Sequence, residues 1–232
     1  VCSSDHVSLS DDTQPFYTIP ASIEATANYD SDIDYMYATP IENAANAPYN
    51  SNSAINLQMN HALTQVSLLV YKDNYNGAGS LTDFYVEDTN PGTNHILVNS
   101  DPIDFTMDVR DGSITGGTKG IIERKLITPL SIGQASQDPK FPSDDLNELK
   151  QQVLTKGVSV LVAPTSLISA GEIKFSFVID GNTYSVVNTS PITWEKGKQN
   201  IYTIRLSGST LSISQVSITK WDPVKAEDLV IN

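Results

Sequence analysis

Apolar and polar residues alternate most regularly between residues 192 and 221. Residues 201–207 place Tyr, Ile and Leu at every second position, which is the period of a β-strand with one buried face. The apolar positions are odd-numbered in residues 210–213 and even-numbered in residues 216–219. This change of parity would turn the apolar side chains to the other face unless an extra residue is absorbed. We therefore predict a β-bulge near Ser214–Gln215.

Two polar turns, Glu195–Lys198 and Gly208–Ser209, divide the same stretch into three strands. Trp194 and Trp221 are its largest apolar residues, and we predict that both pack in a core. No residue of the stretch is placed for catalysis. We interpret it as the closing edge of a β-sandwich.

Further runs of alternating apolar residues, bounded by Gly, Pro and Asn, predict strands along the rest of the chain. Asp111–Gly112 predicts a hairpin with a two-residue type I′ turn, because both residues tolerate positive φ, and Asp180–Gly181 predicts a second hairpin. The predicted strands are residues 16–23, 81–87, 103–109, 121–130, 158–162, 173–179 and 184–186.

The longest apolar run of the first half is residues 57–71, in which His61 lies on the apolar side. The parity of its apolar positions changes, so we predict one strand with a bulge near Thr64–Gln65. A helix over residues 57–66 is an alternative, since three apolar residues there fit a helical stripe. The many strands elsewhere favour the strand.

A long polar insertion at residues 134–156 predicts the one helix of the chain, at about residues 144–153. Asp145 and Glu148 have the spacing of an N-cap residue and the N3 residue that follows it.

Short strands separated by Gly, Pro and Asn turns predict an all-β fold of two antiparallel sandwiches. We place the joint between them at Thr115–Thr118. The predicted domains are residues 1–117, of which 1–15 form a flexible tether, and residues 118–232, which contain the helical insertion.

The chain is acidic, with 232 residues and a net charge of -13, so binding to nucleic acid is not expected. Residues 1–71 hold eight acidic side chains and no Lys or Arg. Cys2 is the only cysteine, which excludes an intrachain disulfide, and no run of 18 apolar residues predicts a membrane-spanning helix.

No motif predicts an enzyme or a cofactor. Of the three histidines, His6, His61 and His95, only His61 lies on an apolar face, and a core histidine is the favoured interpretation over a catalytic base. There is no G-x-S-x-G, C-x-x-C or H-E-x-x-H sequence, so neither a nucleophile elbow nor a zinc site is predicted.

Two weaker patterns remain as alternatives. Asp30, Asp32 and Asp34 have the first spacings of a calcium loop, but Tyr35 stands where that loop needs glycine, so no metal site is predicted. Four tyrosines could stack on a sugar, although packing within strands is the favoured interpretation; they are Tyr29, Tyr35, Tyr37 and Tyr49.

Three motifs in order carry a family resemblance. They are D-x-M-Y-A at residues 34–38, H-A-L at residues 61–63, and a block that runs from W-x-x-G at Trp194 to I-T-x-W at Trp221. Together they resemble the fimbrillin family of Bacteroides-type bacteria.

The resemblance implies two transthyretin-like β-sandwiches in tandem, in a lipoprotein displayed on the outer surface of the cell. In polymerising members, a protease that cuts after Arg or Lys removes the first strand, and the groove accepts a strand from another subunit. An incoming strand satisfies the exposed backbone and fills the groove with alternate side chains.

The resemblance makes residues 222–232 a candidate donor strand, with Leu229 and Ile231 at period-two spacing. No Lys or Arg precedes Lys72, so such a protease could not release a first strand here. Either the chain is already processed or the subunit keeps its strand, which would suit an anchor or tip subunit.

The sequence Cys2-Ser3-Ser4-Asp5 resembles the start of a mature bacterial lipoprotein, although Val1 departs from the small residue usual before the cysteine. Cys2 is therefore the lipidation candidate, and a lipid is the expected link to the outer membrane. Our hypothesis is a fimbrial structural subunit at the cell surface that joins other subunits by strand exchange. The alternative is a non-polymerising surface lipoprotein that binds a glycan or a host or bacterial surface ligand as an adhesin.

Overall fold

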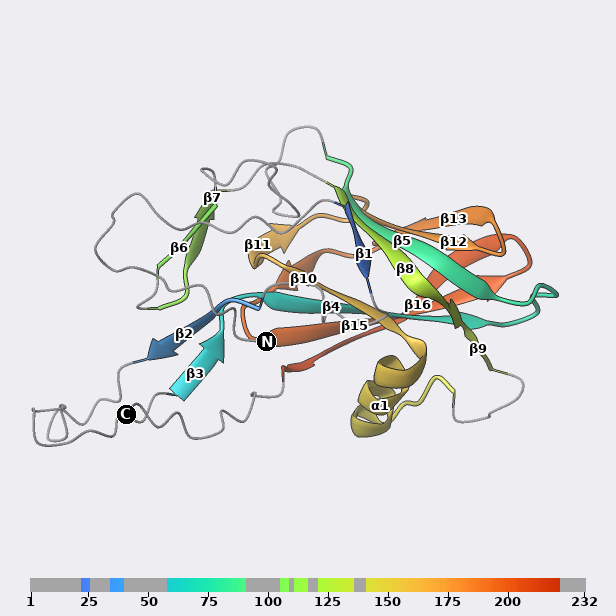
Figure 1. Cartoon of the computed structure of the whole chain (residues 1–232), viewed down its shortest axis with the longest axis horizontal. Helices are drawn as coiled ribbons and strands as arrows, with labels where there is room; N and C mark the ends of the chain where they lie inside the picture. The colour runs from blue at the N-terminus through green and yellow to red at the C-terminus, as the bar shows by residue number, and fades with distance from the viewer. Residues whose placement is uncertain are drawn as a thin grey trace, which may run out of the picture.

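A computed structural model describes residues 22–25, 34–39, 58–90, 105–108, 111–116, 121–135 and 141–221 of the chain. Two facing β-sheets form the centre of this part (Figure 1).

The first sheet has the strand order β1-β8-β5-β12-β13 and the second the order β10-β4-β15-β16, with the short β9 beside β4. The bounds in the first sheet are β1 Ser22–Ala25, β5 Ser80–Asp88, β8 Ile121–Ser131, β12 Ile173–Ile179 and β13 Asn182–Val187. Those in the second are β4 Thr64–Lys72, β9 Gly133–Gln134, β10 Val158–Val162, β15 Lys198–Ser207 and β16 Thr210–Lys220.

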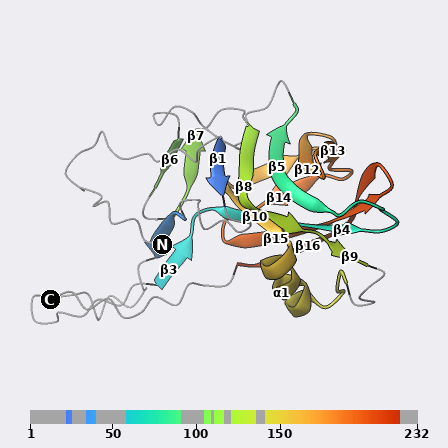
Figure 2. The ribbon, with the colours of Figure 1, turned by 45° about the vertical axis from the view of Figure 1, so that its right-hand side comes forward.

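Three smaller pairs and one helix complete the described elements. The pairs are β2 Met36–Thr39 with β3 Gln58–His61, β6 Phe105–Met107 with β7 Ile114–Gly116, and β11 Thr165–Ile168 with β14 Ile192–Trp194. Figures 1 and 2 show the β2–β3 and β6–β7 pairs at the same end of the sandwich. The predicted all-β fold with a single short helix is confirmed for the described residues.

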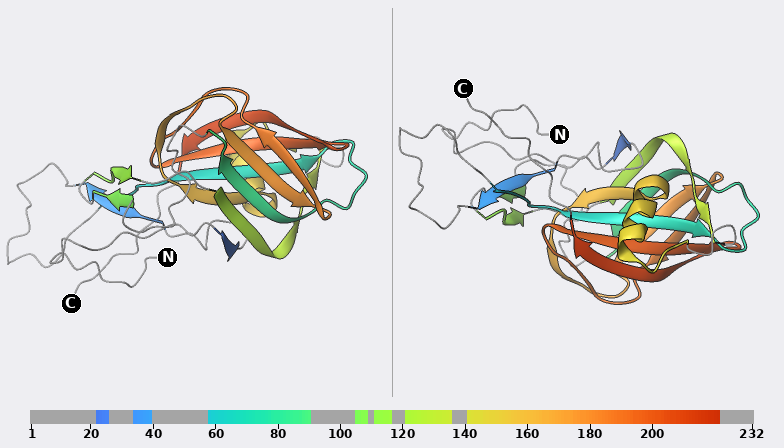
Figure 3. Two further views of the ribbon diagram at one scale, coloured as in Figure 1. Left: turned by 90° about the horizontal axis from the view of Figure 1, so that it is seen from above. Right: turned by 90° about the horizontal axis from the view of Figure 1, so that it is seen from below.

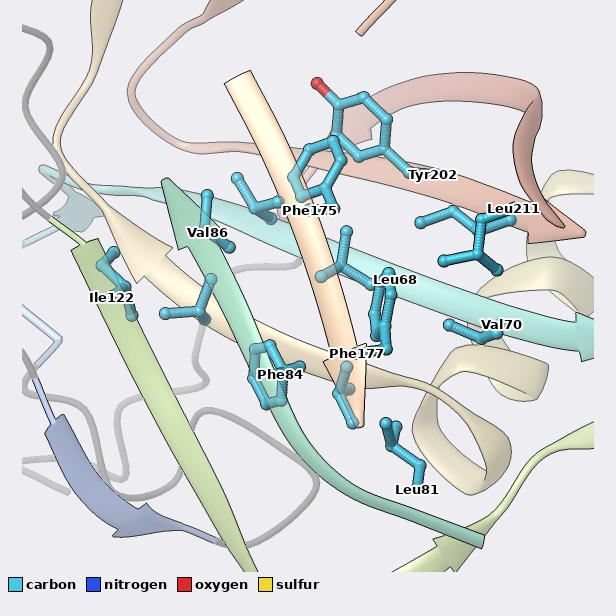
Figure 4. Close-up of a cluster of buried hydrophobic side chains, with 14 of the residues drawn as sticks. Leu68, Val70, Leu81, Phe84, Val86, Ile122, Phe175, Phe177, Tyr202 and Leu211 are labelled. Carbon is cyan, nitrogen blue, oxygen red and sulfur yellow. The ribbon is translucent and has the colours of Figure 1, made fainter. Parts of the chain in front are cut away.

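The main core lies between the two sheets, where alternate residues of facing strands meet (Figure 4). Phe84 and Phe175 come from the first sheet, and Leu68 and Tyr202 from the second. All four side chains are fully buried. Because successive residues of a strand point to opposite faces, the other parity of the second sheet needs its own cover.

That cover is the helix α1, Leu146–Lys156, which lies across the outer face of the second sheet (Figure 3). Leu149 and Val153 pack on Leu69 of β4 and Ile201 of β15. Asp145 caps the helix by accepting a hydrogen bond from the Glu148 amide, as predicted, and the helix runs three residues beyond the predicted end.

The predicted bulge in the last strand is confirmed. Thr203 pairs with Gln215 and Ile204 pairs with Ile213, so Ser214 is the extra residue of β16. The hairpin at Asp180–Gly181 is also confirmed, since both residues have positive φ, 51° and 77°.

Two local predictions are wrong. Residues 58–72 form two strands, β3 and β4, because the chain breaks at Ala62–Leu63 and each part pairs with different neighbours. The β6–β7 hairpin has a four-residue loop: the Asp108 amide donates to the Ser113 carbonyl, so Asp111–Gly112 is not a two-residue turn. Gly112 alone supplies the left-handed conformation expected there, with a φ of 70°.

The pairing between strands crosses the predicted domain boundary at residues 117 and 118. β5 pairs with β8 and β12, and β4 pairs with β10 and β15. A division of the chain into residues 1–117 and 118–232 would therefore cut both described sheets. The pairing is also mixed, because β4 and β15 run parallel at the centre of the second sheet. In the predicted first strand, residues 16–21 lie outside the described part, and β1 follows them directly with residue 22.

Candidate functional site

The three motifs of the sequence meet at one end of the sandwich, in a cluster that we call the junction and define as Asp34, His61 and Trp221. The His61 ring, 5% exposed, stacks on the Trp221 indole with 3.7 Å between centroids and 10° between planes. Its Nδ1 lies 2.9 Å from one oxygen of Asp34 and 3.2 Å from the other. An ionised carboxylate only accepts hydrogen bonds, so Nδ1 carries the hydrogen.

Backbone hydrogen bonds tie the same elements together. The Ala62 amide donates to the Tyr35 carbonyl at 2.8 Å, and the Gly197 amide donates to the Leu63 carbonyl at 2.8 Å. The Trp221 amide in turn donates to the Gly197 carbonyl at 3.0 Å. The end of β16 is thus fixed to both the turn before β15 and the start of β4.

An apolar cluster behind the junction extends this contact to the β6–β7 hairpin. Its buried members are Leu63, Leu161, Ala163 and Trp221, and Tyr35 and Ile114 pack against them. The junction and this cluster therefore join five separate parts of the chain, residues 34–35, 61–63, 114, 161–163 and 221.

Lys196 reaches across the same end of the molecule. Its Nζ donates to the Asp111 carbonyl at 2.5 Å and lies 5.0 Å from the centre of the Tyr37 ring. Gly112 lies against that ring so closely that a Cβ atom would come within 2.2 Å of it. Tyr37 is thus used for packing and not for an open stacking platform.

A second candidate site is the open side of the sandwich, where β13 and β16 are the last strands of the two sheets and contact each other. A groove of about 390 Å³ lies between them. Apolar side chains contribute most of its lining, which consists of Ser185, Val186, Val187, Thr189, Leu211, Ser212 and Ile213.

Further along β16, apolar side chains of the inner face are exposed. Val216 and Ile218 pair with Tyr202 and Asn200, so they lie on the face of the second sheet that carries the buried Tyr202. Val216 is nevertheless 43% exposed and Ile218 57% exposed. This exposed pair distinguishes the last part of β16 from the rest of the strand.

The predicted landmark residues fall in two places. His61 and Trp221 lie in the junction, whereas Trp194 is buried between the sheets, where its Nε1 donates to the Tyr202 hydroxyl at 2.9 Å. Several candidates fall outside the described residues; they are the lipidation candidate Cys2, the tether 1–15, the donor-strand candidates Leu229 and Ile231 in the tail 222–232, and Tyr29, Asp30, Asp32 and Tyr49.

Of the calcium-like triplet, the structure describes Asp34, and its carboxylate is bonded to His61. Within the described part of the chain, no three His, Cys, Asp or Glu side chains are grouped as a metal site would require. In the same ranges there is no helix with the length and apolar character needed to cross a membrane.

Sequence reasoning missed two features of these sites. The partner of His61 is 27 residues away at Asp34, and only the joint occurrence of the two motifs could have suggested the contact. The exposure of Val216 and Ile218 was also missed, because alternation shows which face a side chain lies on and not what covers that face.

A family model described as fimbrillin-like matches residues 8–221 of the chain. No curated protein matches the sequence.

Three solved structures similar to this chain come from Bacteroides species. A candidate cell adhesion protein from Bacteroides uniformis is 12% identical to this chain, with a TM-score of 0.45. The match covers 81% of this chain and 66% of the Bacteroides uniformis chain. Another from Bacteroides ovatus is 10% identical with a TM-score of 0.47, over 72% of this chain and 48% of its own. A fimbrial protein from Bacteroides vulgatus is 12% identical with a TM-score of 0.40, over 72% and 56%. The chain thus spans between 48% and 66% of the length of these three proteins.

Proposed function

Because the chain belongs to the fimbrillin-like family, we propose that it is a structural subunit of a cell-surface fimbria that joins other subunits by β-strand addition. Family membership supports a fimbrial or adhesion-type protein of the cell surface. The strand exchange, the partner subunits and the place in the fimbria are the proposal.

The junction is the observation that carries this proposal. Asp34, His61 and Trp221 belong to the motifs of the family resemblance, and in this chain they hold elements together. Residues 222–232 follow directly after Trp221, whose amide is bonded to Gly197. A donor segment that starts from a fixed residue loses less conformational freedom on pairing than one that starts from a loose end.

The donor in this proposal is the segment 222–232, and its apolar residues Leu229 and Ile231 would enter the neighbouring subunit. The first strand stays in place, because no Lys or Arg before Lys72 offers a cleavage point. A subunit that keeps its first strand and carries a lipid on Cys2 would serve as the anchor of a fimbria in the outer membrane, or otherwise as its tip.

The test compares multimers of the full chain with those of two variants. Unheated samples of the unmodified protein should give a ladder of multimers on gels, and L229K with I231K should abolish it. V230K is the matched control, because its side chain lies on the other parity of the same segment and should leave the ladder intact. A protein that stays monomeric at every concentration, or a ladder that survives L229K with I231K, would contradict strand donation.

The alternative role as a non-polymerising adhesin has a separate readout. A monomeric protein that binds one defined sugar tightly on a glycan array would favour it. Mass analysis of the protein isolated from its own cells tests the anchor: acyl chains on Cys2 support membrane attachment, and an unmodified cysteine counts against it.

A further inference from the structure

We propose that in the unassembled subunit residues 226–232 fold back as an additional antiparallel strand on the free edge of β16, and that this strand covers Val216 and Ile218. The connecting turn is Asp222–Lys225. The inference concerns the resting position of the segment that the proposed function makes a donor, and its role in controlling assembly rests on that function.

The backbone of β16 directs the polar groups of alternate residues away from β15. The Trp221 amide bonds to Gly197, which makes these two residues a hydrogen-bonded pair of the β15–β16 ladder. Such pairs alternate in an antiparallel ladder, so Val216, Ile218 and Lys220 direct their N–H and C=O groups away from β15. Among the described strands, β16 pairs only with β15, and its outer edge is unpaired.

One hydrogen bond supports this orientation. The Lys220 carbonyl accepts from Nζ of Lys150, a residue of α1, at 3.3 Å. This carbonyl therefore bonds to a side chain outside the β15–β16 ladder, as an outward-directed group of an edge strand can do. A second lone pair of the carbonyl remains for a strand.

The side chains of two of these residues leave apolar surface exposed. Val216 and Ile218 combine an outward-directed backbone with an apolar side chain that is 43% and 57% exposed. An extended strand with two apolar residues at period-two spacing would both bond to this backbone and cover these side chains. Leu229 and Ile231 are two such residues in the segment that follows.

Residues 222–225 have a sequence that favours a tight turn. Asp222-Pro223-Val224-Lys225 has Asp at the first position of a type I turn and Pro at the second, the residues favoured there. Four-residue hairpin loops are commonly built around this turn. With residues 222–225 as the loop, Trp221 faces residue 226, and the register is fixed from there.

In this register, unlike charges and apolar residues face each other. Glu227 lies opposite Lys220, Leu229 opposite Ile218, and Ile231 opposite Val216. Cross-strand pairs of both kinds are favourable in antiparallel sheets. A loop shorter by one residue would place Asp228 opposite Ile218 and would lose all three pairs, and a loop longer by one residue would place Asn232 opposite Val216.

The charge of the edge agrees with an acidic partner. The ribbon of β15 and β16, residues 198–220, has three basic side chains and no acidic one, whereas the whole chain has a net charge of -13. Lys150 adds a further positive charge beside the Lys220 end of the edge. The segment 226–232 has two acidic residues and no basic one.

The consequence is a subunit that occupies its own edge before assembly. Leu229 and Ile231 would be held on the chain that carries them and would have to leave β16 in order to enter a neighbour. This competition suppresses premature edge-to-edge association, which an exposed apolar edge strand otherwise promotes.

Disulfide trapping of the full chain tests the register. In a C2S background, I218C with L229C places two cysteines directly opposite each other, and V216C with I231C does the same one pair further on. In each pair, one cysteine replaces an exposed residue of β16 and the other lies in the added segment. The Cα atoms of opposite residues are about 5.5 Å apart, which is within the range of a disulfide. Mild oxidation should close an intrachain disulfide in each variant, read as faster migration on non-reducing gels and loss of the thiol hydrogens by mass.

I218C with V230C is the matched control, because the two side chains would lie on opposite faces and should stay reduced. Equal trapping of this control, or no trapping of either matched pair, would overturn the proposal.

Mixing chains that carry only I218C with chains that carry only L229C detects pairing between copies. Exclusive crosslinking between copies would overturn the resting position in one chain while it supports strand donation. Intrachain trapping in a protein that never forms multimers would support the resting position and count against the proposed function.

Hydrogen exchange gives an independent readout. The amides of Val216 and Ile218 should be protected in the unmodified chain and exchange at least tenfold faster in L229K with I231K. The amides of Ser217 and Thr219 face β15 in the same ladder and should keep their protection in both proteins. Equal exchange of Val216 and Ile218 in the two proteins would refute the added strand.

Discussion

Substitution of His61 separates the two contacts that hold the junction. His61→Phe keeps an aromatic ring for the stack on Trp221 but removes the nitrogen that donates to Asp34. His61→Ala removes both contacts. The comparison therefore measures the ring and the hydrogen bond in turn.

The expected costs follow from the burial of the site. The side chain of His61 is 4% exposed and that of Asp34 14%, so removal of the nitrogen leaves a carboxylate with little access to water. A hydrogen bond to a charged group contributes about 1.5–3 kcal/mol, and we expect His61→Phe to cost roughly 2 kcal/mol. The aromatic pair adds about 0.5–1.5 kcal/mol to its buried area, so His61→Ala should cost roughly 1–2 kcal/mol more.

Urea unfolding measures both changes through the midpoint. With an m-value of about 3 kcal/mol/M, a loss of roughly 3 kcal/mol lowers the midpoint by about 1 M. Trp221→Ala completes a double-mutant cycle with His61→Ala, in which contacting residues couple by at least about 0.5 kcal/mol. Strictly additive costs, or equal costs for His61→Phe and His61→Ala, would show that the stack does not stabilise the fold.

Three further substitutions test other contacts. Hydrogen bonds from the Gly79 amide and, to a lesser extent, the Ser80 amide lower the pKa of Asp180, so the stability that its carboxylate contributes is present above the unfolded pKa and is lost as the pH falls through the folded pKa. D180N should therefore flatten the dependence of stability on pH below about pH 4, and an unchanged dependence in thermal unfolding would contradict this reasoning. Y202F leaves the buried Trp194 indole N–H without its acceptor, so the free energy of unfolding in urea should fall by about 1–3 kcal/mol. An unchanged free energy would show that this hydrogen bond does not stabilise the fold. D145A removes the N-cap of α1 and should lower the free energy of unfolding by about 1 kcal/mol. The neighbouring D144A should lower it by less, and equal losses would show that Asp145 does not stabilise the helix as its cap.

Local structure was predictable where it depends on neighbours in sequence. The parity change in β16 predicted a bulge, and Ser214 is the extra residue. The spacing of Asp145 and Glu148 predicted the start of α1. Each of these signals is complete within a few residues, because a side chain's face and a helix cap are set by the local backbone.

Strand partners were not predictable in the same way. Residues 58–72 have a parity change like that of β16, but here it marks a break between β3 and β4, which pair with different strands. Alternation gives the same signal for a bulge and for a short break. The sequence Thr115–Thr118 predicted a joint between domains, yet described strands before it and after it share both sheets. A local composition signal carries no information on which strands pair across it.

The candidate sites divide along the same line. His61 and Trp221 were placed in the core from their positions in strands, and both are buried. The role of Asp34 was not recognised, because three acidic residues at alternate positions resembled a metal loop more than the partner of a distant histidine. A buried polar side chain needs a partner, but the sequence does not say where along the chain it lies.

The junction and the free edge of β16 are linked by one structural cause. The bond from the Trp221 amide to Gly197 assigns the odd-numbered residues of the last part of β16 to β15, which leaves the backbone groups of Val216 and Ile218 on the outer side. The extra residue Ser214 sets the other half of the arrangement, because without it these side chains would point to the face that carries α1. Within the described part of the chain, the same two residues therefore combine unpaired backbone with exposed apolar surface, close to the point where the chain continues into its candidate donor segment. An added strand would bind to unpaired backbone and alternate apolar side chains, and the bond of Trp221 to Gly197 fixes the register that brings the two together.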